Sequence, residues 1–225
     1  MSAPTPKPIS TPKPTTPNWR QKSTIIYITG PPGTGKATQS SLLSTRHSST
    51  IAHIALHNLL EISLTNQSQN RSESKYHADI ERNVREGKTS SKAFCADLLR
   101  YALVQGVYKE GKKIFILEGF PLTLDEAELF ESKICEPSLV LNFSCPEEDS
   151  VPRLVRRGCM HGMRYDSTVS ILDRLGRFER DTVPVVEFYR GKGVVRDIDA
   201  SKDVEEVYWE VRAVLAEEGV VIFEN

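Results

Sequence analysis

The sequence predicts an α/β fold in which a five-stranded parallel sheet carries helices on both faces. Short apolar runs rich in β-branched residues alternate along the chain with segments whose apolar residues recur at i, i+3 and i+4. A glycine-rich turn follows the first apolar run and leads directly into the first helical segment. This alternation is typical of strands that are buried on both faces and connected by helices, which is the arrangement of a parallel sheet.

The apolar runs give five expected strands, at residues 23–29, 51–55, 113–117, 139–143 and 194–198. Helical spacing gives expected helices at residues 37–44, 90–107, 124–132, 167–189 and 203–216. A further helix is expected after the fourth strand, and it contains Pro152. Because a proline in a helix interior costs about 3 kcal/mol, we expect this helix to begin near Ser150, with the proline in its first turn.

The N-terminal segment differs from the rest of the chain, since residues 1–22 hold six prolines among Ser, Thr and Lys. Such a segment cannot bury a core, so we expect a disordered or polyproline-like arm. Two roles stay open for it, a flexible tail and a ligand for an SH3 or WW domain. Its only arginine is Arg20, whereas transit peptides are Arg-rich. Residues 23–225 are long enough for one α/β domain.

The amino-acid composition argues against some classes of binding partner and indicates the cellular compartment. A formal net charge of -1 gives no electrostatic reason to expect nucleic acid or an anionic membrane. No run of about 18 apolar residues is present, so no membrane span is expected. The four cysteines form no C-x-x-C pair and no secretory signal precedes them. We therefore expect reduced thiols in the cytoplasm, with the nucleus left open as a second location. A monomer is also expected.

The glycine-rich turn has the spacing of a phosphate-binding P-loop, Gly30-x4-Gly35-Lys36. Glycines allow successive N–H groups to converge on phosphate oxygens at a helix N-terminus, and the lysine adds a full charge beside the β- and γ-phosphates. The next residue is Ala37, where most P-loops place the Ser or Thr that ligates magnesium. The expected ATP-binding residues are Gly30, Gly33, Thr34, Gly35, Lys36, Ala37 and Thr38.

Several motifs together resemble those of nucleoside monophosphate kinases of the adenylate kinase and UMP/CMP kinase group. They are the P-loop at 30–39, Glu118-Gly119-Phe120-Pro121, Arg157-Gly158, Asp166, Arg174 and the segment 198–207. The resemblance covers roughly residues 23–217. It implies a P-loop NTPase fold, ATP and Mg²⁺ as cofactors, and nucleotides as partners. It also implies a small helical acceptor-binding insert at about 56–88 and a short lid at about 158–168.

Glu118 ends the third expected strand, so it lies beside the P-loop if the first and third strands are neighbours. Such a carboxylate can order the water shell of Mg²⁺, and no direct protein ligand to the metal is expected. A solvated acid at a strand end is the alternative. The resembled family usually has Asp at this position.

The expected catalytic cations are Lys36, Arg157, Arg164 and Arg174, because phosphoryl transfer depends on charge stabilisation more than on covalent chemistry. In the resembled family, lid arginines close over the phosphates, and Arg157 and Arg174 match such positions. Arg164 stands in Gly162-Met163-Arg164, where the family has Gly-Arg. For any single arginine a solvent-facing role remains the alternative.

The acceptor side departs from the family pattern. The expected acceptor-binding residues are Ala55, Asn58, Glu61, Gly119, Leu122 and Glu126. Two of them, Glu61 and Leu122, replace phosphate-binding arginines, and Glu126 replaces the Gln that would contact the base. Two lost charge-assisted contacts imply acceptor binding weaker by roughly 10²–10⁴. Basic residues that could compensate are Arg71, Lys75, Arg82, Arg85, Lys88 and Lys92.

Three functions remain open from the sequence. The first is ATP-dependent phosphoryl transfer to a nucleoside monophosphate of the UMP/CMP or AMP type, which forms a nucleoside diphosphate. The second is an ATP-binding, catalytically weak or inactive regulatory P-loop protein. The third is a small-molecule kinase or NTPase with a non-nucleotide acceptor.

Overall fold

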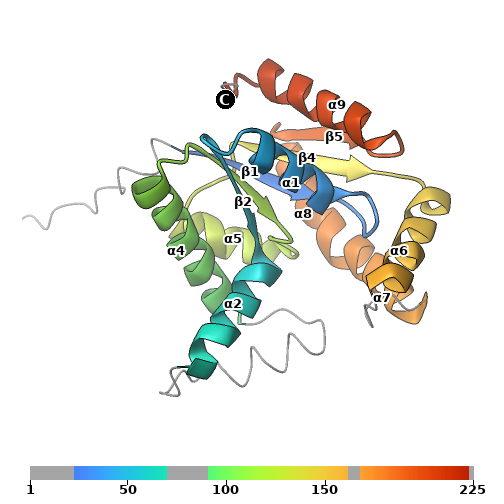
Figure 1. The fold of residues 1–225 in the computed structure, drawn as a ribbon, viewed down its shortest axis with the longest axis horizontal. Helices are drawn as coiled ribbons and strands as arrows, with labels where there is room; N and C mark the ends of the chain where they lie inside the picture. Colours follow the sequence, from blue (N-terminus) through green and yellow to red (C-terminus); the bar gives the residue numbers. More distant parts are fainter. Residues whose placement is uncertain (1–22, 70–90, 162–167, 223–225) are drawn as a thin grey trace, which may run out of the picture.

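The computed structural model describes residues 23–69, 91–161 and 168–222, arranged as Figure 1 shows. Their strands form one parallel sheet in the order β2-β3-β1-β4-β5. The strands are β1 (Thr24–Thr29), β2 (Ile51–Ala55), β3 (Ile114–Glu118), β4 (Leu139–Ser144) and β5 (Val195–Asp199). The predicted five-stranded parallel sheet is confirmed, with each strand end within one residue of its expected place.

Helices connect these strands throughout the described ranges. They are α1 (Lys36–Arg46), α2 (Leu56–Gln69), α4 (Lys92–Glu110), α5 (Leu124–Lys133), α6 (Glu147–His161), α7 (Thr168–Arg177), α8 (Val183–Gly191) and α9 (Val204–Glu217). The proline-rich arm at 1–22 lies outside the described residues. So do the part of the expected acceptor-binding insert beyond residue 69 and residues 162–167 of the expected lid.

The sheet is buried on both faces, as its apolar strands require. In β1, Ile25 and Tyr27 pack into one apolar cluster, and Ile26 and Ile28 into the other, because successive side chains point to opposite faces. The first cluster is completed by side chains of α2, α4, α5 and α8, and the second by side chains of α1 and α9. In Figure 1, α1 and α9 accordingly lie on the opposite side of the sheet from α4, α5 and α8.

The single helix expected at 167–189 is wrong, because a π-helical turn at Phe178–Thr182 separates α7 from α8. The amide of Val183 donates to the carbonyl of Phe178, which is the i to i+5 bond of a π-turn. Pro184 comes next, in the first turn of α8. It lacks an N–H, and its ring would clash with the carbonyl four residues earlier in a regular α-helix. The wide turn therefore lies where an unbroken α-helix would be strained.

The expected start of the helix after β4 is also wrong. This helix, α6, begins at Glu147 rather than near Ser150, so Pro152 lies in its second turn. The Pro146 carbonyl accepts the amides of Asp149 and Ser150, which closes the first turn. That turn carries three acidic side chains, which the positive end of the helix dipole favours. These interactions outweigh the local cost of the proline.

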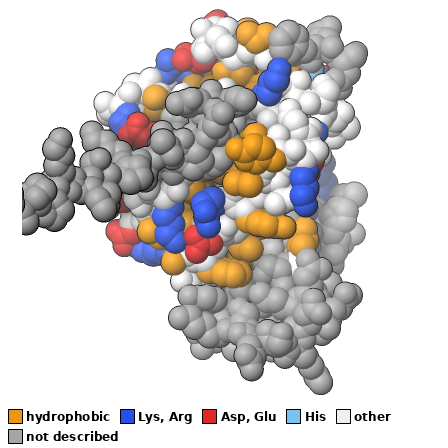
Figure 2. All heavy atoms as spheres, turned by 90° about the vertical axis from the view of Figure 1, so that its left-hand side faces the viewer, with side chains coloured by type: hydrophobic (Ala, Val, Ile, Leu, Met, Phe, Trp, Pro, Cys, Tyr) orange, Lys and Arg blue, Asp and Glu red, His pale blue; other side chains and the backbone are white. Residues whose placement is uncertain are grey.

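The outer side of α4 carries two exposed aromatic side chains. Tyr101 is 64% exposed and Tyr108 is 65% exposed. Figure 2 shows the side of the molecule on which α4 lies, where hydrophobic side chains stand between lysine and arginine side chains. The apolar surface on this face is therefore divided by charge. No helix in the described ranges combines the length and the apolar character needed to cross a bilayer.

The packing of α4 gives a testable expectation for stability. Leu99 is 0% exposed and packs in the cluster that contains Phe115 and Leu117, whereas Tyr101 projects from the same helix into solvent. Leu99→Ala should lower the free energy of unfolding by about 2–5 kcal/mol. Tyr101→Ala should change it by less than about 1 kcal/mol. Urea denaturation followed by circular dichroism measures both, and equal losses would contradict the packing of α4 on the sheet.

Candidate functional site

The P-loop joins β1 to α1, and its shape depends on two glycines at which a side chain would collide with neighbouring backbone. Gly30 has φ 136°, and a Cβ there would overlap the Phe143 carbonyl oxygen on β4. Gly33 has φ 87°, and a Cβ there would lie 2.5 Å from the Ser150 carbonyl oxygen on α6. The loop therefore packs directly against the backbones of β4 and α6. Lys36 begins α1, so the N-terminus of this helix opens onto the loop.

Lys36 lies inside the loop that precedes it. Its Nζ donates to the carbonyl oxygens of Gly30, at 2.7 Å, and Pro31, at 2.6 Å. Burial lowers the pKa of Lys36 to about 8; Glu118 opposes this shift, and Arg157 and Arg174 add to it. The ammonium group is thus held by weak neutral acceptors that phosphate oxygens could replace.

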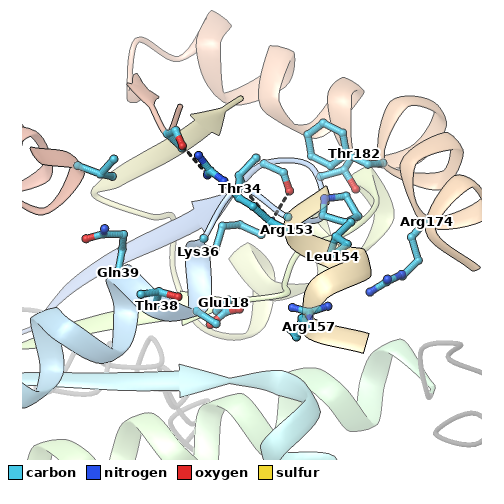
Figure 3. A pocket seen from close by; sticks show the side chains of 18 of the residues that line it. Thr34, Lys36, Thr38, Gln39, Glu118, Arg153, Leu154, Arg157, Arg174 and Thr182 are labelled. Atoms are coloured by element: carbon cyan, nitrogen blue, oxygen red, sulfur yellow. Dashed lines mark hydrogen bonds between the residues drawn. The ribbon is translucent and has the colours of Figure 1, made fainter. Parts of the chain in front are cut away.

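Glu118 ends β3 next to the P-loop, since Ile28 of β1 is its partner in the parallel register. The side chain is buried, and its Oε2 accepts a hydrogen bond from Nε2 of His53, at 2.8 Å. His53 comes from β2, the strand on the other side of β3. The sequence predicts Glu118 here but gives no sign that a histidine orients it. In Figure 3, Glu118 lies on the same side of the pocket as Thr38 and Arg157.

The P-loop forms one wall of a cavity of about 930 Å³. Seven basic side chains line it, and four acidic ones. The basic residues are Lys36, Arg153, Arg156, Arg157, Arg174, Arg177 and Lys202. Figure 3 shows Arg157 on α6 and Arg174 on α7, with the guanidinium of Arg174 directed toward Arg157. Since most of these cations come from two adjacent helices, the cavity suits a ligand that carries several negative charges.

The loop between β5 and α9 closes one end of the cavity. Arg153 of α6 donates through Nη1 to the Ala200 carbonyl, at 2.8 Å, and through Nη2 to the Ser201 carbonyl, at 3.0 Å. Nε2 of Gln39, on α1, donates to the Val204 carbonyl, at 2.8 Å. Helix α6 is therefore bonded to this loop and α1 to the first residue of α9, and these contacts fix the end of the cavity beside β5.

The loop after β3 forms the opposite end. The amide of Leu122 donates to Oε2 of Glu126, at 2.8 Å, and Oγ1 of Thr182 donates to the Leu122 carbonyl, at 3.2 Å. Glu126 is 2% exposed, and burial raises its pKa while the hydrogen bond from Leu122 counteracts the rise. This end thus presents a buried carboxyl group and an apolar side chain.

The structure brings together most of the predicted site residues. Those that line the cavity are Gly30, Gly33, Thr34, Gly35, Lys36, Ala37, Thr38, Glu118, Leu122, Glu126, Arg157 and Arg174. Gly119 lines a separate small cavity of about 50 Å³ behind the P-loop. Ala55, Asn58 and Glu61, all within the described residues, line neither cavity. Arg164 lies outside the described residues.

Several lining residues were not predicted from the sequence. Arg153 lies one helical turn before Arg157, so the helical period could have indicated it. The lining residues Arg177, Asp181 and Thr182 come from the end of α7 and the π-turn. Pro184 signals a break in the helix, but it does not specify the π-turn that places the last two.

The side chains that line the cavity indicate how Mg²⁺ could be bound. Within the part of the chain that the structure describes, no three His, Cys, Asp or Glu side chains group together as metal ligands. Glu118 is a carboxylate that lines the cavity with Lys36 and interacts with it electrostatically. Mg²⁺ is commonly bound by one or two carboxylates together with substrate phosphates and water. The residues present therefore fit a magnesium ion that phosphates hold in large part.

Comparisons with known proteins agree with this geometry. A family model described as adenylate kinase matches residues 28–194. The uridylate kinase of Saccharomyces cerevisiae is 33% identical over 188 residues, which cover 84% of this chain and 88% of that protein. The UMP-CMP kinase of Lentinula edodes is 32% identical, over 87% of this chain and 86% of that protein. Adenylate kinase isoenzyme 1 of Gallus gallus is 32% identical, over 83% of this chain and 91% of that protein.

The lowered pKa of Lys36 gives a pH-dependent expectation for ATP binding. In the protein without ATP, Lys36 loses its proton near pH 8, whereas bound phosphates would keep it charged. ATP should therefore bind about tenfold more weakly at pH 9 than at pH 7. Titration calorimetry at the two pH values measures this. Lys36→Met should bind ATP weakly at both, with the pH effect removed. Equal ATP affinity of the natural chain at pH 7 and pH 9 would contradict the expectation.

Proposed function

The chain belongs to the adenylate kinase family, and we propose that it transfers the γ-phosphoryl group of ATP to a nucleoside monophosphate, with ADP and a nucleoside diphosphate as products. The observation that carries this proposal is the common cavity of Lys36, Glu118, Arg157 and Arg174. Glu118 ends β3, Lys36 begins α1, and the two arginines come from α6 and α7. All belong to one chain, which supports a monomer as the active form.

The P-loop and Lys36 would bind the β- and γ-phosphates of ATP. The N-terminus of α1 favours anions, and the Lys36 ammonium would exchange the carbonyls of Gly30 and Pro31 for phosphate oxygens. Arg153 and the loop it holds at Ala200 and Ser201 close the end where the nucleoside of ATP would lie. ATP would thus extend from the β5 end of the cavity toward Glu118.

In the transfer step, an oxygen of the acceptor monophosphate forms a bond to the γ-phosphorus as the bond from that phosphorus to the ADP oxygen breaks. The acceptor oxygen is already anionic, so no general base is required. Negative charge spreads over the transferred group, and Arg157 and Arg174 are placed on one side of the cavity to stabilise it. These arginines would also help to exclude water from the reacting atoms.

Glu118 would hold Mg²⁺ indirectly, and His53 would keep its carboxylate turned toward the cavity. When bound, Mg²⁺ supplies charge neutralisation on the phosphate oxygens of ATP. Ala37 offers no oxygen at the position after Lys36. The neighbouring Thr38, exposed at the start of α1, is the hydroxyl group nearest in sequence.

Glu126 would face the base of the acceptor nucleotide. Its Oε2 accepts the Leu122 amide, and the residue lines the acceptor end of the cavity. A carboxylate can only accept hydrogen bonds, so it favours a base with an exocyclic amino group, as in CMP or AMP. Uracil would present a carbonyl oxygen instead, which leaves two acceptors facing each other.

A spectrophotometric assay that couples nucleoside diphosphate formation to NADH oxidation tests the proposal. With Mg-ATP and AMP, UMP, CMP, dCMP or GMP, the natural chain should turn over at least one monophosphate, and Lys36→Met should lower kcat/KM by about 100-fold or more. Tight ATP binding without turnover of any monophosphate would contradict phosphoryl transfer to nucleotides. It would favour a regulatory ATP-binding protein or a non-nucleotide acceptor.

Replacing Glu126 tests the base contact. In Glu126→Gln, the amide oxygen should accept the Leu122 N–H, so that the NH₂ group points toward the base and donates. The ratio of kcat/KM for UMP to that for CMP should rise by at least about tenfold at pH 8. Glu128→Gln, on the exposed side of α5, is the matched control and should leave the ratio unchanged. An unchanged ratio in Glu126→Gln would place the base elsewhere.

A further inference from the structure

The acceptor end of the cavity needs a positive charge to bind the phosphate group of a nucleoside monophosphate. A nucleoside monophosphate brings a phosphate group of about -1.5 to -2 charge at pH 7. The loop after β3 and the start of α5 line this end with Leu122, Thr123 and Glu126, which offer one carboxyl group and no cation. Among the residues that the structure describes, a cation for the acceptor phosphate would therefore come from another element.

The end of α7 and the adjoining π-turn face the same end of the cavity. Arg177, Phe178, Asp181 and Thr182 all line it. Residues four and five positions apart share a face in a turn of this width, so Arg177 lies about one turn from Thr182 on the cavity side. Oγ1 of Thr182 donates to the Leu122 carbonyl, at 3.2 Å, which holds this segment against the loop after β3. Arg177 is thus the cation that this contact brings to the acceptor end.

The other lining cations have different surroundings. Arg153 is bonded to the carbonyls of the β5–α9 loop. Lys202 pairs with Glu210, at 2.6 Å. Arg157 and Arg174 interact electrostatically with Lys36, at the P-loop. Arg156 is exposed on α6.

One partner of Arg177 is an exposed carboxylate that a phosphate group could replace. Its Nη2 lies 2.5 Å from Oδ2 of Asp173, one turn earlier in α7, and the two side chains are 35% and 60% exposed. A pair this exposed contributes little to stability, because water competes for both groups. A phosphate would offer the same guanidinium two oxygens in a bidentate arrangement.

We infer that Arg177 binds the phosphate of the acceptor monophosphate and positions it for transfer, in the place where Leu122 offers no charge. This inference rests on the proposed phosphoryl transfer. Arg177 reaches the acceptor phosphate from α7, whereas the loop after β3 contributes only backbone and apolar contacts.

Kinetics and direct binding of the chosen monophosphate test the inference on the full chain. Arg177→Ala should raise the KM and the Kd for the monophosphate by at least about tenfold, with the Kd for ATP changed by less than about twofold. Arg177→Lys should retain part of the affinity, since it keeps the charge without the planar fork. Arg180→Ala is the matched control. Arg180 lies in the adjoining π-turn, is 67% exposed and pairs with Asp181, at 2.8 Å, and its replacement should leave both affinities unchanged.

A second substitution separates a phosphate contact from a structural effect. Adding Leu122→Arg to Arg177→Ala should recover monophosphate binding by about tenfold, because it places a guanidinium at the same end of the cavity. A fold defect would not be rescued this way. Equal losses for ATP and monophosphate, no loss in Arg177→Ala, or no rescue by Leu122→Arg would each overturn the inference.

Binding data distinguish this inference from the proposed function. If the natural chain binds a monophosphate without turning it over, and Arg177→Ala loses that binding, the inference stands and the proposed transfer fails. If turnover is present and the monophosphate KM is the same in Arg177→Ala, the transfer stands and the inference fails. No calorimetric binding of AMP or CMP by the natural chain at millimolar concentration would overturn the inference.

Discussion

The rest of the structure depends on the parallel pairing of β1 with β3 on one side and β4 on the other. This pairing places the carboxyl ends of all the strands at one edge of the sheet. The P-loop leaves from β1 there, Glu118 ends β3, and the chain enters α6 after β4. Residues of a functional site at this edge lie close together because they follow directly after, or end, neighbouring strands. The glycines at 30 and 33 let the P-loop pack on the β4–α6 backbone without a gap.

Charge is the second constraint, and it follows from the first. The cavity gathers seven basic side chains, among them a lysine that is itself surrounded by carbonyls and arginines. Burial and the neighbouring arginines lower the pKa of Lys36 to about 8, so the cations disfavour one another until an anion enters. A polyphosphate relieves this repulsion. The cluster of cations is therefore electrostatically unfavourable without a ligand, and it favours a highly charged ligand over a neutral one.

Local pattern was sufficient to place the cavity residues next to the P-loop. Lys36 and Glu118 each come after or at the end of a strand of buried apolar residues, so their places could be predicted once the sheet was recognised. Arg177 lies three residues after Arg174 in α7, so the helical period could have indicated it, whereas Asp181 and Thr182 could not be placed while one unbroken helix was expected through 167–189. The π-turn adds a residue and rotates α8 relative to α7, and the Thr182 contact to Leu122 joins segments 60 residues apart. Such contacts arise from tertiary packing.

Transfer of a labelled γ-phosphoryl group tests the central claim most directly. The natural chain would be incubated with Mg²⁺, ATP labelled in the γ-phosphoryl group, and CMP or AMP, and the products separated by anion-exchange chromatography. Phosphoryl transfer between nucleotides predicts that the label appears in the β-phosphate of CDP or ADP, at a rate that Lys36→Met lowers by about 100-fold or more. Label that appears only in inorganic phosphate, or that remains in ATP with every monophosphate, would contradict it.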